Sequence, residues 1–469
     1  MTESPRATGG RRLGTTARHL ALATLLCTSG VGAIAHQSKA ADLGSDCCAD
    51  LEERVAELEA TTVRKGNKKV SVTFYGKVNK AVLFWDDGAI EDVYVVDSSY
   101  ESTRFGILGS AKIGGDWSAG FRLEVEDRVA ASQRVSQFDA GNVEGPSLRT
   151  RWSSMYLNNL RWGELRWGTT ATPKYDITKD TNVFVPNLLD TTSSDNRMNQ
   201  NFRLRPKGFN DAADLSTLTW SSISRCYSSA ESFNCSTRRA GVAYWSPKWQ
   251  GFGASLGWFQ NDIWGAALRY KKDWGQNFEV GAGIGYEDFH RRRSSGSASF
   301  DQFDEWAGMA NIKHKPTGLF VYSDFSFSAP SDTSARGIFT KKSPPDLSAW
   351  DVWVGIQRKM PRLGLDSLGD TAFWGGFANT HDGIGGVPLN GLLPAGTFAN
   401  VPVNTQITGA DVDRWFLALG QSIDSAAMQL YAVYQHLDAE VDLIDKELKH
   451  VPAPLDDFDL FYTGAIIYF

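Results

Sequence analysis

The sequence lacks any uninterrupted apolar run of the roughly 18 residues that a membrane-spanning helix requires. It is also poor in metal-binding residues, with five cysteines and seven histidines among 469 residues and none at the spacing of a zinc site. The mean hydropathy of −0.30 resembles that of a soluble protein. These absences exclude a helical membrane protein, and they leave a soluble protein or a barrel that crosses a membrane with strands.

Glycine and aromatic residues are abundant, and they favour the barrel. The chain has 45 Gly, 16 Trp, 14 Tyr and 26 Phe. Transmembrane barrels use aromatic residues in the two girdles at the membrane interfaces.

The N-terminus has the pattern of a secretory signal peptide. Four arginines before residue 19 precede the apolar stretch Leu20–Leu26, and small residues follow as far as Ala41. We therefore predict a signal peptide over 1–41 and export of the remaining chain, because nothing after it resembles a stop-transfer segment.

Residues 42–69 predict a short N-terminal helix and a linker. Leu51, Val55, Leu58 and Thr62 follow coiled-coil spacing over about two heptads. So short a coil needs an oligomer to bring copies together; an amphipathic helix in the periplasm or at the pore mouth is the alternative. The basic segment 64–69 reads as a flexible linker.

From Val70 onward, polar and apolar residues alternate with period two, as strands between lipid and a wet lumen require. The pattern is clear over 70–78, 117–125 and 278–286. Lys80 has the lipid-facing parity of the first strand, so it lies near a membrane interface or under a neighbouring subunit. Gly281, Gly283 and Gly285 recur at every second position and mark an inner face where space is needed.

Short and long connections also alternate along the chain, as the turns and loops of a barrel do. Tight turns are predicted near 114–116, 161–163, 247–251, 273–276, 315–318 and 423–424, and long polar segments lie between them. This predicts an all-β, antiparallel transmembrane barrel of about 16 strands over 70–469, with an indistinct boundary near 261–264. The segment 459–469 is expected to close the barrel.

The cysteines predict one local disulfide. Cys226 and Cys235 are nine residues apart in a serine-rich segment of an exported chain. The adjacent Cys47 and Cys48 cannot easily pair with each other, so they either link subunits or stay as thiols.

Four stretches resemble the general porins of Gram-negative bacteria, and more closely those of alphaproteobacteria. They are 74–78, 102–109 with 120–124, 162–168 with 172–176, and 244–247 with 251–252. The resemblance implies a trimeric outer-membrane barrel of sixteen strands whose third extracellular loop, here 172–237, folds inward and narrows the pore.

The resemblance also implies a constriction with basic wall residues opposite acids of the loop. The wall positions are matched by Lys77, Arg104, Arg151 and Arg238, and the candidate loop acids are Asp176, Asp180 and Asp190. Strand parity supports an inner-face position for Lys77, which shares the odd face of its strand with Ser71 and Thr73. It also supports one for Arg104, which alternates with Phe105 and Ile107, and Arg151 alternates with Trp152 in the same manner. Opposed charges across a narrow gap would orient dipolar solutes and set a charge preference.

We therefore expect a porin for passive diffusion of small hydrophilic solutes and ions. Its expected partners are two further copies of the chain, outer-membrane lipid and lipopolysaccharide, with no nucleic acid, cofactor, metal or catalytic residue. The alternatives are a substrate-selective channel, an outer-membrane barrel enzyme and an envelope-tethering protein. Gly253–Gly257 matches a nucleophile-elbow pattern, but it lies within an alternating strand, so we interpret the match as coincidence.

Overall fold

The chain divides into Met1–Leu58 and Glu59–Phe469, and the fold described below belongs to the second unit. The computed structural model describes residues 69–141, 148–175, 177–184, 197–224, 238–290, 302–330, 339–340, 345–361, 364–365, 367–383, 401 and 405–469. The predicted signal peptide, the N-terminal helix, and Cys226 with Cys235 lie outside these residues.

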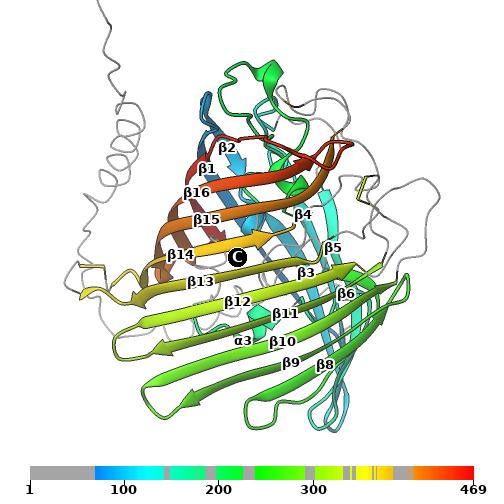
Figure 1. Ribbon diagram of the computed structural model, residues 1–469. Helices are drawn as coiled ribbons and strands as arrows, with labels where there is room; N and C mark the ends of the chain where they lie inside the picture. The colour runs from blue at the N-terminus through cyan, green and yellow to red at the C-terminus, as the bar shows by residue number, and fades with distance from the viewer. Residues whose placement is uncertain are drawn as a thin grey trace, which may run out of the picture. The chain divides into compact units, whose positions relative to one another are not determined.

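One antiparallel sheet of eighteen segments closes on itself in the described part of the chain (Figure 1). The segments are β1 (Ser71–Asp86), β2 (Glu91–Asp97), β3 (Arg104–Gly114), β4 (Trp117–Asp127), β5 (Leu148–Asn159), β6 (Gly163–Ala171), β7 (Arg238–Trp245), β8 (Phe252–Phe259), β9 (Ile263–Trp274), β10 (Phe278–His290), β11 (Gln302–His314), β12 (Leu319–Pro330), β13 (Leu347–Arg358), β14 (Thr371–His381), β15 (Gln406–Ile423), β16 (Met428–Ile444), β17 (His450–Val451) and β18 (Phe458–Tyr468). The described helices are α3 (Ile177–Thr181) and the single turns η1 (Ser99–Glu101), η3 (Ala212–Asp214), η4 (Trp220–Ser222) and η6 (Asp424–Ala426).

These eighteen segments make sixteen crossings of the wall. β2 and β3 pair with the two halves of β1 and are separated only by η1. β17 and β18 pair in the same way with two parts of β16. The prediction of an antiparallel barrel of about 16 strands is confirmed.

The barrel closes between its first and last strands, as 459–469 predicted. β1 pairs with β18 from Lys77 opposite Tyr468 to Asp86 opposite Asp459. Backbone hydrogen bonds of 2.9 and 3.0 Å then join Gly76 to Phe469.

The predicted tight turns all join neighbouring strands at one end of the barrel. The indistinct boundary near 261–264 proves to be a tight turn at the opposite end, between β8 and β9. Asn261 and Asp262 there have φ values of 69° and 57°. Phe259 pairs with Ile263, so the loop has three residues, and Asn and Asp adopt positive φ more readily than most other side chains.

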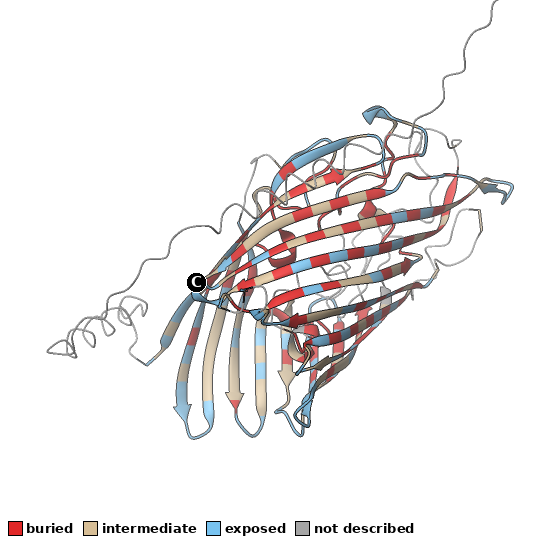
Figure 2. Ribbon diagram, turned by 90° about the vertical axis from the view of Figure 1, so that its left-hand side faces the viewer, coloured by how far each residue is buried: buried red, intermediate tan, exposed pale blue. Residues whose placement is uncertain are grey.

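Burial alternates residue by residue along the strands, so the two faces of the wall differ (Figure 2). On β1, Phe74 and Val78 point outward and are 51% and 44% exposed, whereas Asn79, Ala81 and Leu83 point inward and are buried. The exposed apolar and aromatic side chains form the lipid-facing surface that a transmembrane barrel needs. Among the described residues, no helix is long and apolar enough to cross a membrane.

Part of the inner wall is apolar, which the expectation of a wet lumen did not include. Trp85 of β1 and Phe458 of β18 point inward and are buried against Phe202 and Trp220 of the segment 197–224. The ring centroids of Phe202 lie 5.1 Å from those of both Trp85 and Phe458. The apolar core of this protein therefore lies inside the barrel, where the segment between β6 and β7 covers the wall.

Candidate functional site: the luminal wall and loop

The segment between β6 and β7, which we call the luminal loop (172–237), contacts the inner wall through several of its described residues, while its described part near Lys207 contacts the segment before β18. Its helix α3 contacts β9, β10 and β11 (Figure 1). A Cβ at Gly281 or Gly283 would collide with Thr181 or Ile177 of this helix. The glycine stripe therefore provides the predicted space, and α3 occupies it.

A buried ion pair holds the next part of the luminal loop. The Arg205 Nε and Nη2 atoms each donate a hydrogen bond of 2.8 Å to a carboxylate oxygen of Asp87, and both side chains are 1% exposed. Bidentate guanidinium–carboxylate contacts fix geometry as well as charge. The loop is thus attached to the turn between β1 and β2 as well as to the apolar wall.

Lys77 and Arg104 lie opposite each other on β1 and β3 and share one carboxylate. Both form ion pairs with Glu101 of η1, and their side chains are 11% and 8% exposed. Both side chains lie on the inner face, which is the face that strand parity predicts for them. One carboxylate therefore pairs with two cations, and it comes from the turn between β2 and β3 rather than from the luminal loop.

Arg151 lies on the same part of the wall, but the predicted alternation with Trp152 is wrong. Glu124 of β4 pairs with Trp152 and Val125 pairs with Thr150, so Arg151 is the extra residue of a β-bulge. The bulge allows Arg151 and Trp152 both to contact inner-face groups. Arg151 binds Glu124 at 2.8 Å and also Glu126.

The remaining predicted residues have different surroundings. Arg238, at the start of β7, donates a 2.6 Å hydrogen bond to the Tyr175 hydroxyl at the start of the luminal loop. Asp180 of α3 forms a 2.8 Å ion pair with Arg269 on β9, the wall against which α3 packs. Asp176 and Asp190 lie outside the described residues.

Several residues of this site were missed from the sequence. The carboxylates that the structure brings to Lys77, Arg104 and Arg151 are Glu101, Glu124 and Glu126, together called the wall carboxylates. Two further arginines join them: Arg122 binds Glu124 at 2.7 Å, and Arg149 binds Glu126 at 2.6 Å. The sequence could have indicated two of them, because Arg122 and Glu124 are two residues apart in a predicted strand and therefore share its polar face.

We call Lys77, Arg104, Arg122, Arg149 and Arg151 the basic cluster. Its five cationic groups face three wall carboxylates, so this patch of the described lumen carries an excess of positive charge. A positive patch on the wall of a water-filled passage attracts anions and repels cations without binding either tightly.

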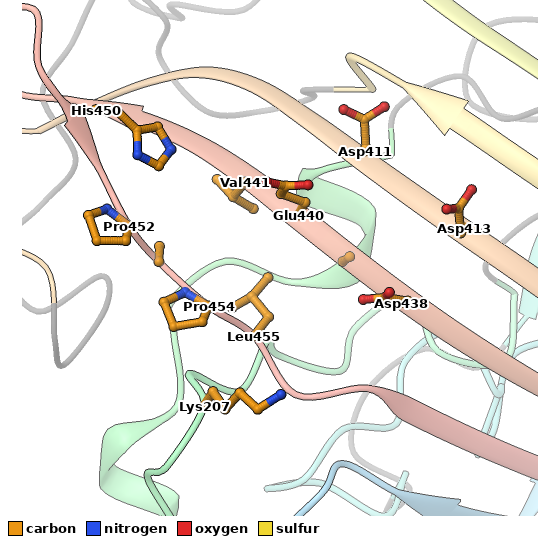
Figure 3. A pocket seen from close by; sticks show the side chains of 12 residues that line it. Lys207, Asp411, Asp413, Asp438, Glu440, Val441, His450, Pro452, Pro454 and Leu455 are labelled. Atoms are coloured by element: carbon orange, nitrogen blue, oxygen red, sulfur yellow. The ribbon is translucent and has the colours of Figure 1, made fainter.

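A pocket of about 410 Å³ opens at the long-loop end of the barrel (Figure 3). Asp411 and Asp413 of β15 and Asp438 and Glu440 of β16 line it, with Lys207 of the luminal loop. Because its carboxylates outnumber its cations, this pocket does not suit an anion. Among the described residues, no group of three or more His, Cys, Asp or Glu side chains could hold a metal ion.

The serine of the nucleophile-elbow pattern, Ser255, lies within the continuous strand β8. An elbow requires a sharp turn from a strand into a helix. The stretch is the strand that the sequence predicted, without the turn into a helix that an elbow needs.

Comparison with known proteins gives one family and a set of similar barrels. Residues 21–355 match the family model described as Gram-negative porin. The anion-selective porin from Comamonas acidovorans is 14% identical, with a TM-score of 0.51 over 85% of this chain and all of that one. OmpF of Salmonella typhi, in complex with daunomycin, is 13% identical, with a TM-score of 0.47 over 86% and 99% of the two chains.

A trimer form of OmpT, an outer membrane protein of Vibrio cholerae, is also similar, at 13% identity and a TM-score of 0.47 over 86% of this chain and all of that one. At 14% identity the likeness to the Comamonas porin concerns the fold alone. No curated protein sequence matches this one significantly.

Proposed function

This chain belongs to the Gram-negative porin family, and on that premise we propose that it lets small hydrophilic solutes and ions diffuse passively through its barrel with a preference for anions. The family match and the closed sixteen-strand barrel identify an outer-membrane porin. They also favour a channel over an enzyme.

The observation that carries the anion preference is the excess of cations over carboxylates in the basic cluster. Lys77, Arg104 and Arg151 are largely paired with the wall carboxylates, whereas Arg122 and Arg149 are 35% and 50% exposed. Net positive charge on side chains that reach water raises the local concentration of anions. The selectivity of the related Comamonas protein, stated in its name, agrees with this direction.

Bilayer recordings test the proposal directly. Purified protein in a planar membrane, with a potassium chloride gradient across it, should form open channels whose reversal potential indicates chloride permeating better than potassium. The preference should weaken as ionic strength rises, because salt screens exposed charges within about 10 Å at 0.1 M. Absence of open channels would refute the porin proposal, and a preference for potassium would refute the anion assignment.

We assign the pore constriction to the luminal loop and the wall that carries Lys77, Arg104, Arg151 and Arg238. In this proposal Asp180 acts with Arg269 beside α3, and Asp176 and Asp190 add acid to the loop side. Replacing Arg104 and Arg151 together by Ala should reduce anion preference. Because both are buried against carboxylates, the change would also expose Glu101 and Glu124 to the pore.

We further propose that the protein is a homotrimer, and Lys80 carries this proposal. Lys80 lies on the outer face near the middle of β1, is 48% exposed, and binds Asp97 of β2 at 2.9 Å. A charge facing lipid at mid-depth costs roughly 2 to 4 kcal/mol. A neighbouring subunit over this patch removes the cost. Native mass measurement in detergent should give three copies, and a monomer would refute the proposal.

Lipid and lipopolysaccharide are the proposed partners of the rest of the outer face, where exposed aromatic side chains border the strands. One observation favours a substrate-selective channel as the second candidate. The luminal loop fills the lumen beside β1 and β18, which narrows the passage on that side. Conductance that saturates with solute concentration would support this candidate over free diffusion.

A further inference from the structure

Arg122 differs from the other members of the basic cluster in how it is held. Its Nε donates a 2.9 Å hydrogen bond to the Tyr75 hydroxyl, and its Nη2 donates one of 2.7 Å to Glu124. Tyr75 in turn donates to the same carboxylate at 2.8 Å. The guanidinium carbon also lies 4.1 Å from the ring centre of Trp152. Three contacts from three strands therefore fix the plane of this guanidinium, and the Tyr75–Glu124 hydrogen bond holds two of its partners together.

The same contacts leave one edge of the guanidinium open. Nη1 of Arg122 donates to no acceptor among the described residues, and the side chain is 35% exposed. Arg151, by contrast, uses both Nε and Nη1 on carboxylates and is 7% exposed. Arg149 is more exposed but makes a single ion pair, so its planar group is less constrained.

A fixed guanidinium with a free edge is suited to oxyanions. Its parallel N–H groups match the two oxygens of a carboxylate or phosphate, whereas a spherical halide gains no advantage from the planar geometry. Ordering this group in advance also removes most of the entropy cost of each contact. Arg122 lies two residues before Glu124 on the same face of β4, toward the end of the strand that begins at the tight turn. It is therefore at the edge of the group of ion pairs that Glu101, Glu124 and Glu126 form.

We propose that Arg122 is the residue that determines specificity in this channel, and that its free edge forms a transient subsite for small oxyanions such as inorganic phosphate and simple carboxylates. Tyr75 and Trp152 are the positioning residues of this subsite. The inference rests on the proposed diffusion function and refines it from a general anion preference to a preference for oxyanions over chloride.

The test is the phosphate-to-chloride permeability ratio, measured from bi-ionic reversal potentials of the intact protein in planar bilayers. Arg122→Gln should lower this ratio by about two- to fivefold, the range expected of an ionic contact that stays in water. Arg122→Lys keeps the charge but loses the planar fork. It should therefore retain preference for chloride over potassium while losing the preference for phosphate. Tyr75→Phe should behave as a weaker form of Arg122→Lys.

Arg161→Gln is the matched control. It removes the same charge from a side chain that is 82% exposed in the turn after β5, and its ratio should equal that of the unaltered protein. Equal ratios for Arg122→Gln and Arg161→Gln, or full phosphate preference in Arg122→Lys, would overturn the oxyanion subsite. Channels that fail to open in the unaltered protein would instead refute the diffusion function.

Discussion

The contact between α3 and the glycine stripe of β10 gives the sharpest test of how the luminal loop is held. A Cβ built at Gly281 collides with the Thr181 carbonyl oxygen and lies 2.9 Å from the Asn311 Oδ1 atom. The first of these is a backbone atom, so no change of side-chain rotamer relieves the collision. In Gly281→Ala, either the strand or the helix must shift.

A shift of the strand and a shift of the helix have similar free-energy costs. Overpacking a closely packed site typically destabilises by about 1 to 3 kcal/mol. If α3 lifts away instead, the burial of Ile177, which is fully buried in the structure, is lost at a cost of about 1.5 to 3 kcal/mol. We therefore expect Gly281→Ala to destabilise the folded barrel by about 1 to 3 kcal/mol, and to change single-channel conductance because α3 lies in the lumen.

Thermal unfolding, followed by the gel mobility of the folded barrel, measures the first effect and bilayer recording measures the second. Gly253→Ala in β8 is the control, since among the described residues the only heavy atom within 4 Å of its added Cβ is the Lys248 Cγ, at 3.8 Å. Identical unfolding temperatures and conductances for the two variants would show that α3 does not rest on Gly281.

Three further changes test other contacts. Asp87→Ala leaves the buried Arg205 without its carboxylate, which should cost about 3 to 5 kcal/mol and increase protease cleavage of the luminal loop; unchanged cleavage would contradict this attachment. Lys80→Leu leaves the buried Asp97 without its cation, so the proposed trimers should dissociate in detergent at a lower temperature. An unchanged dissociation temperature would show that Lys80 lies away from the subunit interface. Phe469→Ala removes a ring stacked 5.6 Å from that of Phe74 and should lower the yield of folded barrel in refolding assays, and an undiminished yield would show that the ring is dispensable.

Much of the barrel was predictable because its signals are local. Period-two alternation identified β1, β4 and β10, and turn residues such as Gly115 marked the hairpins. The bulge at Arg151 has no such signal, since one inserted residue leaves the composition of the strand unchanged. Because of the bulge, Trp152 also contacts inner-face groups, so the alternation expected between Arg151 and Trp152 is absent although Arg151 lies on the inner face.

The filled part of the lumen was harder to predict because its contacts are distant in sequence. The inner parity of β1 changes from Ser71 and Thr73 to Leu83 and Trp85, a sign that something apolar covers its far end. Nothing local identifies the covering residue as Phe202, or pairs Asp87 with Arg205. The wall carboxylate Glu101 was missed because it belongs to η1, a turn between two strands rather than a strand.

The hydrogen bonds between Gly76 and Phe469 bring the two ends of the barrel chain together. These bonds belong to the seam between β1 and β18, whereas the other strand pairings of the described barrel join strands that lie close together in chain order. The seam can therefore form only after the last strand has been exported. Until then two strand edges stay open to wrong partners, which is the period of greatest aggregation risk. Adjacent ends also permit the seam to be moved: joining residue 469 to residue 69 through a short linker and opening the chain at the turn 260–262 should give a circularly permuted barrel with the same wall.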